Sequence, residues 1–164
     1  GGEVTVTVPV TVTPVNDDPT AEAEQGFTID EDTEHQGKII AEDKDKGDKL
    51  TYKVGEAPKN GTVTVDEKTG EYTYKPNPDY HGDDKFTVVV SDGNGGEVTV
   101  TVPVTVTPVN DDPTAEAEQG FTIDEDTEHQ GKIIAEDKDK GDKLTYKVGE
   151  APKNGTVTVD EKTG

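Results

Sequence analysis

Residues 97–107 read Glu-Val-Thr-Val-Thr-Val-Pro-Val-Thr-Val-Thr. Valine occupies every second position, and the positions between the valines are mostly threonine. Because successive side chains of a strand point to opposite faces, this pattern predicts a long β-strand with one apolar and one polar face. Pro103 cannot donate a backbone hydrogen bond, so we expect it at a sheet edge or at a bulge.

The same stretch also occurs at residues 3–13. The wider comparison shows that residues 95–164 repeat residues 1–70 letter for letter, which gives a period of 94 residues. This period has the length of a whole domain, whereas solenoid repeats have about 20–50 residues. The chain therefore carries copies of one structural unit and not two unrelated functional domains.

The linker between copies reads Pro-Val-Asn-Asp-Asp-Pro, at residues 14–19 and again at 108–113. Two prolines that flank polar residues indicate a stiff, extended connector. We therefore expect one complete repeat at residues 19–112. Residues 1–18 are expected to be the C-terminal strand and linker of a preceding repeat, and residues 113–164 the N-terminal part of the next identical repeat.

Short alternating runs separated by turn residues predict seven strands in the complete repeat. Such spacing is typical of an all-β, seven-stranded Greek-key sandwich of the Ig or cadherin type. The apolar residues of these strands, such as Tyr52, Tyr74, Phe86 and Val88, are expected to face inward. The predicted strands are residues 21–29, 37–42, 49–54, 61–65, 71–75, 85–91 and 97–107.

The composition is strongly acidic, with a formal net charge of −21, and all 16 cationic side chains are lysines. A chain with this charge repels nucleic acid and anionic membranes. No run approaches the ~20 apolar residues of a membrane span. The sequence therefore predicts no nucleic-acid partner and no direct membrane insertion. Cysteine, methionine and tryptophan are absent, so thiol chemistry is excluded.

Acidic residues outnumber lysines by 21 to nine in residues 19–112, and they gather at predicted strand ends. Like charges that crowd together cost stability unless a cation joins them. Ca²⁺ takes six to eight oxygen ligands and tolerates irregular geometry, so we expect it at Asp43 and Asp45 and at residues 110–112. The alternative is a solvated acidic surface, which we favour for isolated acids such as Glu22 and Glu67. The clusters are residues 29–32, 42–48, 78–84, 91–94 and 110–112.

Several motifs together resemble the cadherin-like or bacterial Ig-like tandem repeats of bacterial surface proteins, many of which are giant RTX-type adhesins. These motifs are the linker at residues 108–113, the Asp-x-Asp pair at residues 43–45, the stretch at residues 79–86 and Val-Ser-Asp-Gly at residues 90–93. The resemblance implies Ca²⁺ between successive domains. It assigns one junction to Asn16, Asp17, Asp18, Asp43, Asp45 and Asp92. It assigns the next junction to Glu31, Asp79, Asn110, Asp111, Asp112, Asp137 and Asp139.

Catalytic motifs are weak in this sequence. Ser91 is the single serine and no histidine lies near it in the sequence, so a serine nucleophile is not expected. Paired carboxylates abound, but a hydrolase also needs an apolar pocket that raises the pKa of one acid. We expect the three histidines to be solvated loop residues and the protein not to be an enzyme.

Two functional interpretations remain open. The first is a Ca²⁺-rigidified extender of a long secreted or cell-surface adhesin, in which identical repeats in one monomeric rod add about 40 Å each. The second is an adhesive module whose exposed threonines at residues 99–107 bind a glycan, ice or another surface, with repetition supplying avidity. Binding assays on one repeat would separate them.

Overall fold

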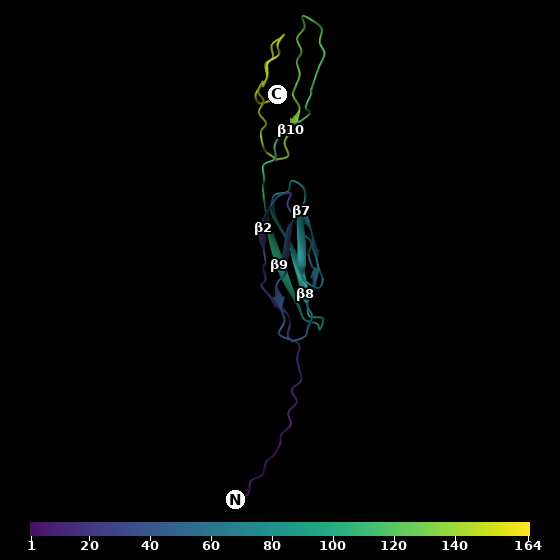
Figure 1. Ribbon diagram of the computed structural model, residues 1–164, viewed down its shortest axis with the longest axis vertical. Coiled ribbons are helices and arrows are strands. Elements are labelled where there is room, and N and C mark those ends of the chain that lie inside the picture. The colour runs from purple at the N-terminus through teal and green to yellow at the C-terminus, as the bar shows by residue number, and fades with distance from the viewer. The chain divides into compact units, whose positions relative to one another are not determined.

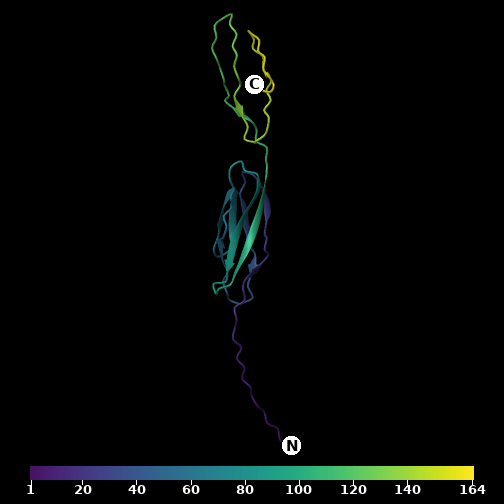
Figure 2. The ribbon, with the colours of Figure 1, turned by 180° about the vertical axis from the view of Figure 1, so that it is seen from behind.

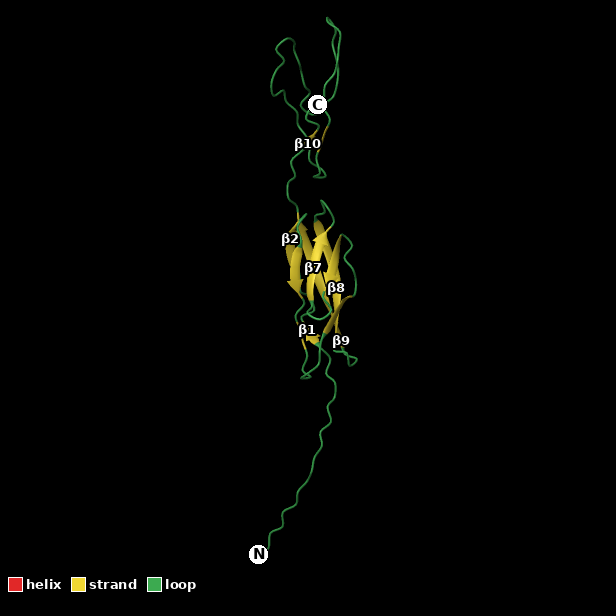
Figure 3. Cartoon of the chain, turned by 45° about the vertical axis from the view of Figure 1, so that its right-hand side comes forward, coloured by secondary structure: helices red, strands yellow, loops and turns green.

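The computed structural model describes residues 1–164, which divide into two compact units, Gly1–Pro108 and Val109–Gly164. The first unit is an all-β sandwich without helices (Figure 3). This confirms the predicted fold class. No helix in the structure is both long enough and apolar enough to cross a membrane.

The sandwich consists of two main sheets and a short strand pair. The four-stranded sheet has the order β2-β9-β8-β5 and the three-stranded sheet the order β3-β7-β6, while β1 pairs with β4. In Figure 1 the long strands β8 and β9 lie side by side, and Figure 2 shows the same pair from behind. The strands are β1 Thr20–Ala21, β2 Phe27–Asp30, β3 His35–Lys38, β4 Ala41–Glu42, β5 Thr51–Val54, β6 Gly61–Val65, β7 Glu71–Pro76, β8 Gly82–Ser91 and β9 Glu97–Thr107.

The core lies between the two main sheets, and its members alternate with exposed residues as the sequence pattern predicts. The valines of β9 and β8 cover the larger sheet, and Tyr74 and Phe86 stack across the core with ring centroids 6.1 Å apart. The fully buried side chains are Ile39, Tyr74, Phe86, Val88, Val90, Val100, Val102, Val104 and Val106.

The first predicted strand is divided in the structure. Residues 20–21 pair with β4, whereas residues 27–30 pair in parallel with β9, Phe27 opposite Val104. Between the two pieces, the side-chain amide of Gln25 donates to Ile40 O and accepts from Ile40 N, both at 2.9 Å. This side chain therefore replaces two backbone bonds at the point where the chain changes sheets. The second predicted strand is likewise divided, into β3 and β4.

Pro103 lies in an interior strand and not at an edge or bulge, so that expectation was wrong. It pairs with Lys85 in an uninterrupted β8–β9 ladder. On the other side of β9, Thr101 N donates to Ala23 O and Thr101 O accepts from Gln25 N. In parallel pairing the next donor on β9 would be residue 103. The missing N–H of Pro103 therefore coincides with the break between the bonds to residues 23–25 and those to β2.

His35 also departs from the sequence expectation of a solvated loop. It lies in β3, half-buried, and its ring stacks on Phe27 with centroids 3.8 Å apart. Burial lowers the pKa of His35 below its ordinary value.

The second unit contains one strand pair, β10 Thr114–Ala115 with β11 Ala135–Glu136, in the register of β1 and β4. Backbone bonds of the first unit recur there: Ile39 N to Gly70 O and its copy, Ile133 N to Gly164 O, both measure 2.9 Å. Phe121, the copy of Phe27, is 64% exposed. Residues 1–13, the copy of residues 95–107, form no strand and are exposed.

Candidate metal centre

An acidic loop, residues 42–48, connects β4 to β5 at the end of the sandwich where the chain enters, which we call the proximal pole. Asp45 N donates to Asp43 Oδ1 at 2.8 Å, and Asp48 N donates to Asp45 O at 3.2 Å. Gly47 has φ +113°, a conformation that L side chains rarely adopt. The turn brings one carboxylate oxygen each of Asp43, Asp45 and Asp48 within 4.8 Å of one another.

The linker contacts this loop within the first unit. Asp17 N donates to Asp45 Oδ2 at 2.7 Å, and Asn16 Nδ2 donates to Asp92 Oδ2 at 2.8 Å. The Asp18 side chain approaches Gly96, and a Cβ added to this glycine would lie 2.7 Å from Asp18 Oδ1. The structure therefore brings together all six residues that the resemblance assigns to this junction, with Asp18 beside Gly96 of the hairpin loop.

Asp92 is only 4% exposed and accepts hydrogen bonds at both carboxylate oxygens. Besides Asn16, its partners are Asn94 N at 2.7 Å and Gly96 N at 3.0 Å, both on Oδ1. The Asn16 amide, and after it these backbone N–H groups, hold the pKa of Asp92 below its usual value although burial opposes them. Asp92 therefore positions the linker against the β8–β9 hairpin.

The arrangement fits a hard cation. Oδ2 of Asp43 is buried and has no hydrogen-bond partner. A buried carboxylate oxygen without a donor is unfavourable unless a cation neutralises it. All the groups that converge here are oxygen ligands, and no cysteine or histidine belongs to the cluster. This ligand set suits Ca²⁺ better than Zn²⁺.

Two residues of this pole were missed by the sequence analysis as site residues. Asp48 is the third carboxylate of the cluster, and Asn94 Nδ2 donates to Asp48 Oδ2 at 2.8 Å. Asp48 follows the turn glycine, Gly47, which was the available signal. The role of Asn94 depends on how the hairpin folds against the acidic loop, and local spacing carries no signal for it.

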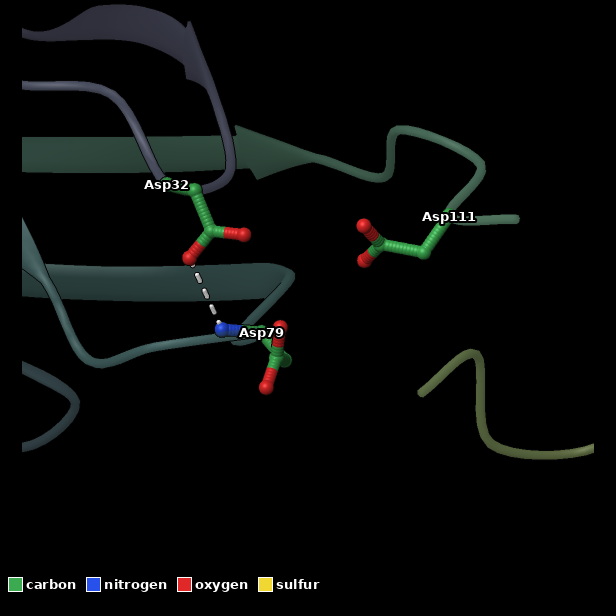
Figure 4. Close-up of side chains that lie close together, drawn as sticks. All are labelled: Asp32, Asp79 and Asp111. Atoms are coloured by element: carbon green, nitrogen blue, oxygen red, sulfur yellow. Dashed lines mark hydrogen bonds between the residues drawn. The ribbon is translucent and has the colours of Figure 1, made fainter. Parts of the chain in front are cut away.

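The opposite, distal pole also gathers acids from the first unit. Asp79 N donates to Asp32 Oδ1 at 3.0 Å, as Figure 4 shows, and both residues have positive φ, 54° and 57°. Glu31, only 5% exposed, lies 3.5 Å from Nδ1 of His81 through Oε2. Glu31 and Asp79 were assigned to a junction by resemblance, and the structure adds Asp32.

The second unit repeats the proximal geometry with its own residues. Asp111 N donates to Asp139 Oδ2 at 2.7 Å, and Asp139 N donates to Asp137 Oδ1 at 2.9 Å. Asp137, Asp139 and Asp142 form the corresponding carboxylate cluster. Asn110 Nδ2 donates to Asp111 O at 3.0 Å, and Asp112 is exposed.

Comparison with known protein families gives a match to the bacterial Ig domain, over residues 16–105 and again over 110–164. The chain belongs to the bacterial Ig domain family. The two matched segments follow the 94-residue repeat, and domains of this family are typically extracellular or surface-exposed. No curated protein matches the sequence of this bacterial Ig chain.

Solved structures similar to this bacterial Ig chain include cadherin ectodomains. Extracellular cadherin domains 1–5 of protocadherin gamma B2 match with TM-score 0.52 and 23% identity, covering 77% of this chain and 27% of that one. The human desmocollin-1 ectodomain matches with TM-score 0.51 and 20% identity, covering 84% and 30%. The chain thus spans less than a third of either structure. This likeness confirms the cadherin-like sandwich.

Proposed function

We propose that this protein is a Ca²⁺-rigidified extender, a spacer segment of a long adhesin of the RTX type that projects a ligand-binding region from a bacterial surface. The observation that carries the proposal is the docking of the linker on the acidic loop, Asp17 N to Asp45 Oδ2 at 2.7 Å, beside the unpartnered Asp43 Oδ2. A cation bound there would hold the linker and the sandwich together.

The cation would take its ligands from both parts of the junction. Asp43, Asp45 and Asp48 would supply carboxylates from the sandwich, and Asp17 and Asp18, which follow Asn16 in the docked linker, would supply oxygens from the linker. Ca²⁺ accommodates such mixed oxygen ligands because its coordination number is high and its geometry flexible. Without the cation, the same carboxylates repel one another, which favours release of the linker.

Each linker follows the last strand of one sandwich in the sequence and precedes the first strand of the next, so it has acidic residues of both as potential partners. Residues 110–112 begin three positions after the end of β9 at Thr107, so they leave the distal pole that holds Glu31, Asp32 and Asp79. Their copies, residues 16–18, contact the sandwich that follows them. In our proposal one ion cluster uses both sets, with Asp137 and Asp139 from the next unit, and thereby fixes the angle between neighbouring repeats.

The other parts of the proposal follow from this role. A spacer has identical neighbouring repeats of the same chain as its partners and needs no catalytic site. Ser91, the single serine, accepts a bond at Oγ from Gly93 N in the hairpin turn, which is a structural role. The net charge of −21 keeps such a rod soluble and monomeric, and it opposes contact with nucleic acid.

Thermal unfolding of residues 1–164 with Ca²⁺ and with a chelator tests the ion. An ion that binds only the folded state stabilises it by about 2.7 kcal/mol at ~100 Kd. We expect the sandwich to melt at a higher temperature with Ca²⁺, and Asp43→Asn to reduce this difference. Glu67→Gln, which removes a charge from the β6–β7 turn, is the matched control and should keep it. Superimposable wild-type melts would refute Ca²⁺ binding.

Small-angle scattering on four tandem repeats tests rigidity separately. We expect the maximum dimension to be sharply defined with Ca²⁺ and to broaden with chelator. Alanine at the positions of Asp111 and Asp137 in each junction should cause the same broadening with every sandwich still folded. A maximum dimension unaffected by Ca²⁺ would contradict the extender role even if Ca²⁺ stabilises each domain.

A further inference from the structure

The β8–β9 hairpin loop, residues 92–96, reads Asp-Gly-Asn-Gly-Gly and lies at the proximal pole. Asn94 at its centre is exposed, and its backbone N donates to Asp92 Oδ1 at 2.7 Å. Its side-chain amide donates to Asp48 Oδ2 at 2.8 Å. Asn94 therefore connects the hairpin to the acidic loop and supplies a neutral donor beside three carboxylates.

An asparagine followed by glycine is chemically reactive because no Cβ on the next residue hinders attack by its backbone nitrogen. The glycines on either side of Asn94 are both exposed. A Cβ built on Gly93 or on Gly95 would meet no atom within 4 Å, and both glycines have positive φ, 79° and 109°. Gly95 also lies outside the β8–β9 ladder, which ends at the pair Ser91–Glu97.

We propose that Asn94 is a site of spontaneous deamidation, and that its conversion places a fourth carboxylate beside the cluster of Asp43, Asp45 and Asp48. In the first step, the Gly95 backbone nitrogen attacks Cγ of Asn94. A bond forms between these two atoms, the Cγ–Nδ2 bond breaks, and Nδ2 leaves as ammonia with the proton that the Gly95 amide loses. The product is a cyclic succinimide.

Water then opens the succinimide ring. Attack at Cγ restores the main chain and gives aspartate, whereas attack at the main-chain carbonyl carbon gives isoaspartate. The net reaction converts a side-chain amide and water into a carboxylate and ammonium, and no oxidant or reductant takes part. In either product, a carboxylate, which can only accept hydrogen bonds, replaces the Asn94 amide that donated to Asp48.

A second Asn-Gly pair in the same sandwich, Asn60-Gly61, has two hydrogen bonds like those of Asn94, but its glycine lies within a strand. Asn60 N donates to Asp84 Oδ2 at 2.9 Å, and Asn60 Nδ2 donates to the Tyr80 hydroxyl at 3.1 Å. A Cβ on Gly61 would lie 2.6 Å from Lys75 O, because Gly61 begins β6 against β7. Attack at Asn60 therefore requires local opening of the sheet, whereas attack at Asn94 requires only the release of two bonds in an exposed loop, Asn94 Nδ2 to Asp48 and Gly95 N to Asp92.

The consequence for ion binding rests on the proposed function. A carboxylate at position 94 faces Asp48 and lies next to Asp92, so it increases like-charge repulsion at the pole without the ion. With Ca²⁺ bound, the same group adds an oxygen ligand of the type that the ion prefers. Deamidation therefore makes the pole more dependent on Ca²⁺ as the protein ages.

Peptide mapping by mass spectrometry, after incubation at mildly alkaline pH, tests the modification without reference to Ca²⁺. Residues 60–68 and 154–162 are identical, so the measurement uses Asn154→Gln, which makes Asn60 the only source of its peptide. We expect Asn94 to convert and Asn60 to convert at least about tenfold more slowly, because it must first open. Equal rates at the two sites, or an unchanged Asn94, would overturn the proposal.

Variants at position 94 test the consequence. Asn94→Asp should widen the difference between the melting temperatures with Ca²⁺ and with chelator, relative to the unmodified chain. Asn94→Gln keeps an amide and should not widen it. An unchanged difference in Asn94→Asp would overturn the charge effect. If the unmodified chain ignores Ca²⁺ while Asn94 still converts, the proposed function and the charge effect fail and the modification stands.

Discussion

Asp84 is a buried carboxylate that accepts four hydrogen bonds. Oδ1 accepts from the backbone N–H groups of Lys59 and Lys85, at 3.0 and 2.9 Å. Oδ2 accepts from Asn60 N at 2.9 Å and from the buried Tyr74 hydroxyl at 3.0 Å. Burial and this carboxylate raise the pKa of Tyr74 above its ordinary value. Asp84 thus joins the loop before β6 to the core, although by sequence it belonged to an acidic cluster.

Replacement of Asp84 by alanine leaves three backbone donors and one phenol without their acceptor. We expect a loss of about 3 kcal/mol in the free energy of unfolding, measured by urea denaturation. The neighbouring exposed carboxylate provides the control, and Asp83→Ala should change stability by less than about 0.5 kcal/mol. Similar effects of the two substitutions would contradict the bonding described for Asp84.

We expect the stability of the folded state to depend on pH through His35. Its pKa in the folded state is lowered by burial, so the unfolded chain takes up the proton more readily. Its contribution is intact above the unfolded pKa of about 6.5 and is lost as the pH falls through the lower folded pKa. Melts between about pH 7.5 and pH 5 should show stability falling with pH, less steeply in His35→Gln. Identical slopes would exclude His35 as the cause.

At the scale of the elements, the change of sheet between β1 and β2 depends on close packing of two residues. A Cβ on Gly26 would lie 2.7 Å from Pro103 Cγ and 2.8 Å from Pro103 O. The backbone at Gly26 can therefore approach β9 where β9 lacks an N–H. Glycine and proline, each unfavourable within a strand alone, are complementary here because they face each other.

Gly26→Ala should therefore destabilise the sandwich, by about 1–3 kcal/mol, since the clash involves backbone on one side. The repeat supplies its own control. Gly120 is the copy of Gly26 in the second unit, and a Cβ there would meet no atom within 4 Å. Gly120→Ala should leave the main urea transition unchanged, and equal shifts for both variants would refute the packing argument.

The sequence predicted elements well where local pattern decides them. The predicted ranges 61–65 and 97–107 coincide with β6 and β9, because strict alternation and turn residues define both ends. The division of the first strand depends on its contacts with β9 and on the bonds between Gln25 and Ile40, which are distant in the sequence. The position of Pro103 depends on the strands that flank β9 in the sheet. No local pattern contains either kind of contact. For the candidate site, the Asp-x-Asp loop was predictable, and the tie from Asn94 to Asp48 was not.

At the scale of the whole molecule, identical copies separate local from tertiary causes. Residues 3–13 and 97–107 have the same sequence, yet only the second stretch forms a strand, because it has β8 and β2 as partners. The acidic loop, in contrast, keeps its bonds in both units, Asp17 N to Asp45 and Asp111 N to Asp139, each at 2.7 Å. The Asp17–Asp45 contact thus recurs in the second unit, whereas the bonds of Asp92 and Asn94 at the proximal pole come from the β8–β9 hairpin.

The parallel pairing of β2 with β9 has a mechanical consequence. The chain enters the sandwich through β1, which leads into β2, and it leaves through β9, so tension along the chain pulls the adjacent strands β2 and β9 in opposite directions along their axes. The hydrogen bonds between them, with those from residues 23–25 to Thr101, then share the load and must break together.

Force spectroscopy through the chain ends should show one high-force rupture per sandwich. Handles at Gly82 and Thr107, adjacent ends of antiparallel strands, load the bonds one by one and should rupture at lower force. The topology thus makes each repeat a mechanically resistant link along one axis, whatever its thermodynamic stability.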